Sequence, residues 1–261
     1  MRIQHNIVAL NAHRNASVNQ TAVSKNMEKL SSGFRINRAG DDAAGLSISE
    51  KMRSQIRGLE QATRNAQDGI SYIQTAEGAL TEVSSMLTRA KELMVQKANT
   101  TYSTEDIANI NAEIGSLGDE IKNIIDTTQF NGKDVFTSSV TVAISHDASS
   151  TMTIAGATDV VADLSTAQLG SGTSIADLED MIDTVNTQRA VYGSQQNRLE
   201  HTINNLGTTS ENLVAAESRI RDVDMASEMM EMTKNNILAQ AAQAMIAQAN
   251  QQPQSVLQLL R

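Results

Sequence analysis

Cysteine and tryptophan are absent from this 261-residue sequence, and proline occurs only once. Without cysteine there can be no disulfide bond, no thiolate metal site and no thiol nucleophile. Three Phe and three Tyr supply few of the large side chains that fill a globular centre. The composition therefore favours long, thin helical bundles over a compact globule.

A basic surface and a membrane-spanning run are also missing. The chain has 21 Lys and Arg against 30 Asp and Glu, a net charge of −9 without a basic patch, so we do not expect nucleic-acid binding. No stretch approaches the roughly 18 consecutive apolar residues of a membrane helix, so we do not expect membrane insertion. Residues 1–6 lack the pattern of a cleavable signal peptide, and secretion would use a route that needs none.

The patterns that carry catalysis or hold a metal are not found. No phosphate-binding glycine loop or serine elbow occurs. Acidic residues at 41–42 and 222–224 could be catalytic acids or ion ligands, but helix caps or salt bridges to nearby arginines are the favoured interpretation. The four histidines lack the spacing of metal ligands: His5, His13, His146 and His201. We expect no enzymatic activity, no metal and no cofactor.

The strongest positive signal is a heptad pattern over residues 175–220. Steps of alternately three and four residues are typical of a helix that packs lengthwise against other helices. At about 1.5 Å per residue this helix would be roughly 70 Å long, and its narrow stripe needs partners along that length. The positions are Ile175, Leu178, Ile182, Val185, Arg189, Tyr192, Gln196, Leu199, Ile203, Leu206, Ser210, Leu213, Glu217 and Ile220.

Two further helices carry matching stripes. One begins at the capping signal of residues 103–106 and has apolar residues up to Ile124. The other spans residues 46–99 in the same heptad pattern, at Met52, Ile56, Leu59, Thr63, Ala66, Ile70, Ile73, Glu77, Leu80, Ser84, Leu87, Lys91 and Met94. We predict that the three helices form one elongated antiparallel bundle or coiled coil over residues 46–221.

The two ends of the chain, residues 1–45 and 222–261, carry weaker helical patterns. The helix before Gly33 has only a thin apolar stripe, and a structured connector rich in glycine follows it up to residue 46. Beyond residue 220, methionine, alanine and glutamine dominate. Pro253 is expected to kink or restart the last helix.

Between residues 130 and 172 the pattern changes to that of β-strands. Asn131-Gly132 is a turn dipeptide, and residues 140–144 and 151–154 are β-like runs around a polar loop. We predict a small β-hairpin region that caps the bundle, with solvated flanks rich in Ser and Thr. The fold class is therefore mainly α.

Four longer motifs occur at the two ends of the chain. The N-terminal motifs are KLSSGFRIN at residues 29–37 and DDAAGL at residues 41–46, and the C-terminal motifs are ESRIRDVDMA at residues 217–226 and AQANQQPQ at residues 247–254. Together they resemble the motifs of bacterial flagellins. The resemblance covers about residues 1–135 and 175–261, with Phe34 where the family usually has Leu. It implies a filament-core layer, a two-helix coiled coil formed by residues 1–45 and 222–261, and a middle layer from the bundle, with a hairpin in place of the outer domains of larger relatives.

The resemblance also implies function, location and partners. The protein would be secreted unfolded through the flagellar export apparatus and would polymerise with copies of itself into the extracellular filament that drives motility. A flagellar export chaperone and a filament cap protein would be further partners. Hydrophobic residues expected in the filament core or held by the chaperone are Met245, Ile246, Val256, Leu257, Leu259 and Leu260. Residues assigned to the connector are Arg35, Asn37, Asp41 and Asp42.

A receptor site is implied in the same way. Arg89, Leu93, Gln96 and Glu113 match motifs of flagellins that bind the animal Toll-like receptor for flagellin, and Lys91 replaces an Arg common in the family. Alternatively, these residues serve subunit packing.

The free energy of ordering the two ends leads to a hypothesis about assembly. Ordering costs about 1–2 kcal/mol per residue in backbone entropy, which one thin stripe on each helix does not offset. We therefore expect the ends to become ordered when copies polymerise. The alternatives are a hook–filament junction protein, a monomeric secreted binder that modulates immunity, and an unrelated coiled-coil enzyme subunit.

Overall fold

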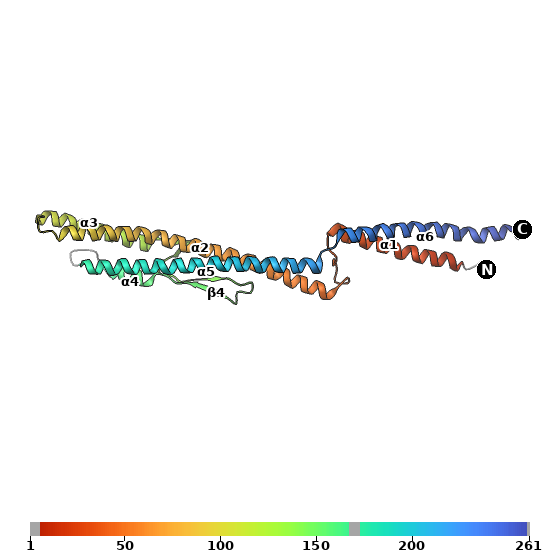
Figure 1. Cartoon of the computed structure of the whole chain (residues 1–261), viewed down its shortest axis with the longest axis horizontal. Helices are drawn as coiled ribbons and strands as arrows, with labels where there is room; N and C mark the ends of the chain where they lie inside the picture. The colour runs from red at the N-terminus through yellow and green to blue at the C-terminus, as the bar shows by residue number, and fades with distance from the viewer. Residues whose placement is uncertain (1–5, 167–172, 260–261) are drawn as a thin grey trace. The chain divides into compact units, whose positions relative to one another are not determined.

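The computed structural model describes residues 6–166 and 173–259, with side chains up to residue 164 and from 173 to 251. The chain divides into a terminal unit, residues 1–54 with 212–261, and a bundle unit, residues 55–211 (Figure 1). Both divisions fall inside long helices, α2 (Ala43–Lys97) and α5 (Ile175–Arg221), and not at the expected positions after residues 45 and 221. No change of composition marks either point, because one continuous helix crosses it.

The terminal unit is a pair of antiparallel helices, α1 (Ile7–Ser32) and α6 (Met225–Leu259), which lie side by side (Figure 1). At one end the side chain of Asn6 bonds to the carbonyl of Ala249, and at the other Lys29 pairs with Glu228. Val23 and Asn26 are the residues of α1 that the pair buries. The thin apolar stripe of α1 therefore buries little hydrophobic surface against α6, as its sequence pattern indicates.

The last helix does not restart at Pro253, since α6 continues through this position to Leu259. A proline has no backbone N–H and leaves the carbonyl four residues earlier without its helical partner. That carbonyl belongs to Ala249, and the Nδ2 of Asn6 donates to it at 2.7 Å. The hydrogen bond lost to proline is therefore replaced from α1.

The bundle unit is built from α2, α5 and α3 (Thr104–Thr127). As expected, α3 begins with a capping box, in which Ser103 and Asp106 each accept the other's backbone N–H. Six of the thirteen predicted heptad positions of α2 are buried, at 59, 66, 73, 80, 87 and 94, and five of the fourteen of α5, at 178, 185, 192, 199 and 206.

Other buried positions lie one residue away from the predicted stripe. In α2 the predicted positions 63, 70, 77, 84 and 91 are half-buried, whereas the buried ones are Ala62, Gly69, Ala76, Val83 and Ala90. In α5, similarly, Met181 and Gln195 are buried in place of Ile182 and Gln196. In α2 most of these buried residues are small, and small side chains let two helices approach closely although they add little to a hydrophobic pattern.

Two short hairpins lie between α3 and α5. The first pairs β1 (Gln129–Phe130) with β2 (Lys133–Asp134) through the turn Asn131-Gly132, whose φ angles of 51° and 75° suit these two residues. The second pairs β3 (Val140–Ala143) with β4 (Thr151–Ile154) in antiparallel register, as the sequence predicts. The small β-hairpin region of a mainly helical fold is thus confirmed.

One helix was not expected. Helix α4 (Thr158–Thr166) lies where Ser and Thr suggested a solvated flank. It buries Val160 and Leu164, one turn apart, against the core of the bundle. Asp163 accepts a hydrogen bond from Thr184 of α5 at 3.0 Å.

The β3–β4 hairpin is fastened along α2. Asn65 donates to the carbonyl of Ala143 at 3.2 Å, and Tyr72 donates to the carbonyls of Val135 and Ser138. At Gly58 a Cβ atom would lie 2.7 Å from the carbonyl oxygen of His146, so the close approach requires glycine.

Candidate functional sites

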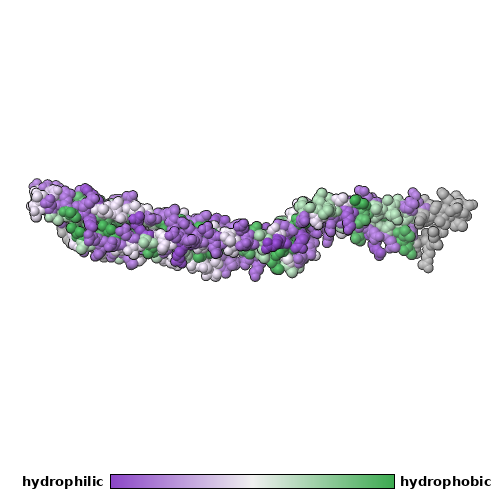
Figure 2. Space-filling view, in the orientation of Figure 1, coloured by the Kyte–Doolittle hydropathy of each residue, from purple (hydrophilic) through white to green (hydrophobic). Residues whose placement is uncertain are grey.

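Hydrophobic side chains lie open to solvent on the terminal unit. Among the described residues, all the exposed large hydrophobic side chains except Val95 and Tyr102 belong to this unit. They occur on both α1 and α6, and Figure 2 shows hydrophobic residues at the surface of this helix pair. The most exposed are Ile7, Leu10, Val18, Met230 and Ile237. Such a surface marks an interaction site.

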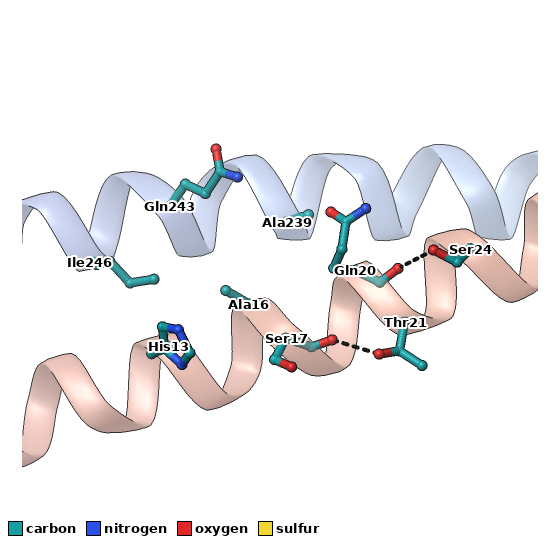
Figure 3. Close-up of a pocket in the computed structure, with 9 residues that line it drawn as sticks. All are labelled: His13, Ala16, Ser17, Gln20, Thr21, Ser24, Ala239, Gln243 and Ile246. Atoms are coloured by element: carbon teal, nitrogen blue, oxygen red, sulfur yellow. Dashed lines mark hydrogen bonds between the residues drawn. The ribbon is translucent and has the colours of Figure 1, made fainter.

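A groove of about 440 Å³ runs between α1 and α6 (Figure 3). Apart from Ile246 on α6, its walls are small or polar: His13, Ala16, Ser17, Gln20, Thr21 and Ser24 on α1, with Ala239 and Gln243 on α6. The hydroxyls of Thr21 and Ser24 already donate to carbonyls of their own helix, at 2.9 and 3.1 Å. The pair alone does not fill this space, and small side chains there let another helix approach closely.

A buried polar cluster fixes the alignment of the two helices. Asn26 and Glu228 are 5% and 8% exposed, and Lys29 lies 3.6 Å from the Glu228 carboxylate. Oriented to satisfy both ends of its amide, Asn26 donates to Glu228 at 3.1 Å and accepts from the backbone N–H of Met232 at 3.2 Å. A buried polar pairing of this kind penalises any shifted alignment, because a shift would leave it unsatisfied. No pattern in the sequence indicates this cluster.

The connector residues are brought together as a structured turn. Arg35 donates its backbone N–H to the carbonyl of Arg221 at 2.7 Å. The Asp41 carboxylate accepts the N–H groups of Arg38 and Asn37, and these bonds hold its pKa below the ordinary value. Asp42 accepts the N–H of Gly45 at 2.9 Å in the first turn of α2. The acidic pair therefore fixes backbone groups, in agreement with the favoured interpretation.

Phe34 also has a place in the connector. The guanidinium of Arg221 stacks over its ring at 4.7 Å and pairs with Glu50 at 2.8 Å. Phe34 stands where the family usually has Leu, and its aromatic ring gives Arg221 a cation–π contact that a leucine side chain could not make.

Three of the four receptor-site residues share one surface of the bundle unit. Arg89 of α2 pairs with Glu113 of α3 at 3.0 Å and with Glu92 at 3.2 Å. Hydrogen bonds from Arg89 to Glu113, and then to Glu92, raise the pKa of the guanidinium, which stays charged in any case. One turn beyond Glu92, Gln96 donates to the hydroxyl of Tyr102 at 3.2 Å.

Leu93 is placed differently from the expectation. Its side chain is 2% exposed and belongs to the hydrophobic core. Lys91 likewise turns away from Arg89 and pairs with Glu179 of α5 at 2.9 Å. Val95, which the sequence did not single out, is the exposed apolar residue beside Gln96.

Of the hydrophobic residues expected at the C-terminal end, Met245 is 58% exposed and Ile246 lines the groove. The side chains of Val256, Leu257 and Leu259, and Leu260 as a whole, lie outside the described residues. Within the described ranges, no helix is long and apolar enough to span a membrane, and no three acidic or histidine side chains gather as metal ligands.

Comparison with known proteins gives consistent matches. Family models described as the bacterial flagellin N-terminal and C-terminal helical regions match residues 3–141 and 175–260. The chain is 56% identical to a flagellin of Halalkalibacterium halodurans over 272 residues and 51% identical to one of Bacillus subtilis strain 168 over 304 residues, in both cases over 100% of each chain. A crystal structure of Bacillus cereus flagellin is 30% identical in sequence. The match covers 59% of this chain and 94% of the Bacillus cereus chain, with a TM-score of 0.46.

Paired terminal helices with an open apolar surface, together with a heptad-patterned bundle, define a helical protein built to assemble. The matches give the particular family: the chain belongs to the bacterial flagellins. It is a structural subunit of the flagellar filament and lacks large outer domains, since the described residues between α3 and α5 form two short hairpins and α4.

Proposed function

We propose that copies of this flagellin join chiefly through the terminal unit, and that covering its apolar side chains is what orders α1 and α6. The observation that carries the proposal is the concentration of exposed hydrophobic residues on this unit. Burying apolar surface yields roughly 25 cal/mol per Å². Ordering costs about 1–2 kcal/mol per residue, and the pair buries only Val23 and Asn26 from α1.

The groove between α1 and α6 supports the same proposal. Its walls of Ala16 and Ala239 let a third helix approach closely, while Gln20 and Gln243 supply polar contacts at its edges. Contacts of one surface with a different surface of the next copy extend into a helical filament when the rotation does not close a ring.

The test changes single exposed side chains. Ile237→Glu and Leu10→Glu place a charge that a packed contact must desolvate, so polymerisation on seeding should be lost. Val95→Glu is the matched control, because Val95 is an apolar residue of the bundle unit that is 55% exposed, against 59% for Ile237. Electron microscopy and sedimentation measure the polymer. Equal loss in the control and the two variants would contradict the proposal.

The alternatives separate in the same preparation. A monomeric secreted binder would form no polymer even when the wild-type protein is seeded. A hook–filament junction protein would not extend into long filaments.

We also propose that Arg89, Gln96 and Glu113 contact the animal Toll-like receptor for flagellin, with Leu93 supporting them from beneath. The Arg89–Glu113 pair supports this, because it joins α2 and α3 into one charged surface beside Val95. A planar guanidinium can bind a carboxylate or backbone carbonyls with several donors at once. Since the Leu93 side chain is buried, its part is to hold α2 in place.

Substitutions distinguish contact from support. Arg89→Ala should weaken receptor binding about tenfold or more in a titration and leave the thermal unfolding temperature unchanged. Leu93→Ala should lower both the affinity for the receptor and the thermal unfolding temperature. Arg53→Ala, an exposed arginine of α2 in the terminal unit, is the control. Unchanged affinity of Arg89→Ala would rule out the contact.

Export and location complete the proposal. The protein leaves the cell unfolded through the flagellar export apparatus, an export chaperone holds the C-terminal residues from Met245 onward, and a cap protein guides addition to the extracellular filament. Exposed Met245 and Ile237 on α6 support a hydrophobic chaperone contact. The role is structural, without catalysis. Binding of the purified chaperone, lost when residues 245–261 are removed, tests the first partner.

A further inference from the structure

Methionine is distributed unevenly between the two units. Among the described residues, the exposed methionines all lie in the terminal unit and are 47–69% exposed: Met27, Met225, Met229, Met230 and Met245. In the bundle unit, Met94, Met152 and Met181 are 4–6% exposed, and Met86 is half-buried. The open thioethers therefore coincide with the surface proposed for assembly.

We propose that these five methionines are a modification site, at which two-electron oxidation of the free subunit by a peroxide blocks its addition to the filament. The inference rests on the proposed role of the terminal unit in joining copies. The chain contains no cysteine and no tryptophan, so no thiol or indole competes for the oxidant. Exposed thioethers are then the most readily oxidised groups of the subunit.

The chemical step is balanced with hydrogen peroxide as oxidant. The thioether sulfur attacks one peroxide oxygen, an S–O bond forms and the O–O bond breaks. The sulfur loses two electrons, and the departing hydroxide takes up the proton of the transferred oxygen and leaves as water. The product is methionine sulfoxide, which a sulfoxide reductase can return to methionine.

The effect on assembly follows from the change of polarity. A thioether is a flexible apolar group that fills irregular contacts, whereas a sulfoxide carries a strong hydrogen-bond acceptor. In a packed contact between copies that oxygen must either find a donor or remain unsatisfied. Met225 and Met229 lie one turn apart, so oxidation makes a continuous part of the surface polar.

Glu228 lies between two of these methionines on α6. Its buried pairing with Asn26 and Lys29 holds the helices together between Met225 and Met229. Because the side chains of Met225 and Met229 are 49% and 47% exposed, their oxidation should change the outer contact and leave the buried pairing intact.

Assembly should in turn protect the methionines. In the filament the five side chains are covered, whereas the buried methionines of the bundle unit are covered in both states. Peroxide should thus oxidise the five residues at least tenfold faster in free subunits than in preformed filaments, as peptide mass spectrometry measures. Equal rates in the two states would overturn the proposal.

The functional test uses the full-length protein treated with dilute hydrogen peroxide and then seeded. Oxidised wild-type subunits should need at least tenfold more protein to polymerise, and treatment with sulfoxide reductase should restore the original value. A variant with Leu at residues 27, 225, 229, 230 and 245 should polymerise equally with and without peroxide, because Leu has a similar volume and does not oxidise. Met94→Leu/Met181→Leu is the matched control and should remain sensitive.

The outcomes separate the two proposals. If untreated wild-type protein polymerises and its oxidised form does so equally well, the modification site is refuted and the assembly surface stands. If oxidised wild type and oxidised five-Leu variant lose polymerisation alike, the damage lies elsewhere and the site is also refuted. If the untreated Ile237→Glu and Leu10→Glu variants polymerise normally, the assembly surface is refuted instead.

Discussion

Asn6 has two hydrogen-bonding roles at one end of the terminal unit. Its Oδ1 accepts the N–H of Ala9 and caps α1, while its Nδ2 donates to the carbonyl of Ala249, which Pro253 leaves without a helical partner. Ala249 is 4% exposed, so water does not readily take the place of Asn6. A sequence separation of 243 residues keeps this contact out of reach of any local pattern.

Exchanging this residue separates the two roles. Asn6→Asp keeps the capping oxygen but loses the donor, and should destabilise the helix pair by about 1–3 kcal/mol because the buried carbonyl is left unsatisfied. Pro253→Ala restores a backbone N–H for that carbonyl, so the Asn6→Asp loss should shrink in this background. Thermal depolymerisation of filaments from the four proteins forms a double-mutant cycle. An equal loss in both backgrounds would show that Asn6 and Pro253 are not coupled.

Tyr192 predicts how the bundle unit responds to alkaline pH. Its side chain is 0% exposed, and burial raises its pKa to about 12, with the Gln188 amide opposing the shift. Up to about pH 10 both folded and unfolded states keep the phenol proton; above it the unfolded state loses the proton first. Tyr192 should therefore lower the free energy of unfolding progressively between about pH 10 and 12, by up to about 2–3 kcal/mol.

Tyr192→Phe removes this ionisation. Urea unfolding at pH 8 and at pH 11.5 should show a smaller alkaline loss in the variant than in the wild type, although Tyr72, whose pKa burial also raises, retains part of it. An identical loss in both proteins would mean that Tyr192 ionises as readily when folded as when unfolded.

Among the helices and strands, regular patterns made the prediction possible. The heptad stripe gave α5 to within one residue of its end, and the capping box fixed the start of α3. The β-like alternation and the Asn131-Gly132 turn gave both strands of the second hairpin and the turn of the first. Helix α4 was missed because it is nine residues long and, among its described side chains, buries only Val160 and Leu164, which is too little periodicity to recognise.

The inner stripe of α2 shows a limit of the pattern. Hydrophobicity favours Ile70 over Gly69, but the space between packed helices favours the smaller residue. At Gly69 an added Cβ would lie 3.0 Å from Val142, so the size of the facing residue decides which position is buried. That information resides in the neighbouring element and not in the helix's own sequence.

The hairpin's attachment to α2 can be tested with two glycines of the same helix. Gly58→Ala would place a Cβ 2.7 Å from the His146 carbonyl and should push the β3–β4 loop away, with faster proteolysis at residues 145–150 and a loss of about 1–3 kcal/mol. At Gly78 a Cβ meets nothing within 4 Å, and Gly78→Ala should stabilise the helix by about 0.5–1 kcal/mol. The same response of both variants would show that the loop does not depend on Gly58.

In the molecule as a whole, sequence motifs identified the family, but the candidate surfaces needed the fold. Both ends carry specific motifs, so the filament role follows from the chain alone. Which apolar side chains remain open depends on which faces α1 and α6 turn toward each other, and a thin stripe does not settle that. For the same reason Leu93 looked like a contact residue, although the packing of α2 buries it.

The boundary between the two units also could not be predicted from the sequence. Helices α2 and α5 each belong partly to both units, so their sequences contain no linker, cap or break at residues 54–55 and 211–212. Only the set of contacts made by each half defines the division.

Amide hydrogen exchange, compared between the free subunit and the filament, tests the central claim most directly. If the terminal unit is completed by neighbouring copies, amides of α1 and α6 should exchange rapidly in the subunit and at least a hundredfold more slowly in the filament, while the core of α2 and α5 in the bundle unit is slow in both. Slow exchange along α1 and α6 already in the isolated subunit would contradict the account.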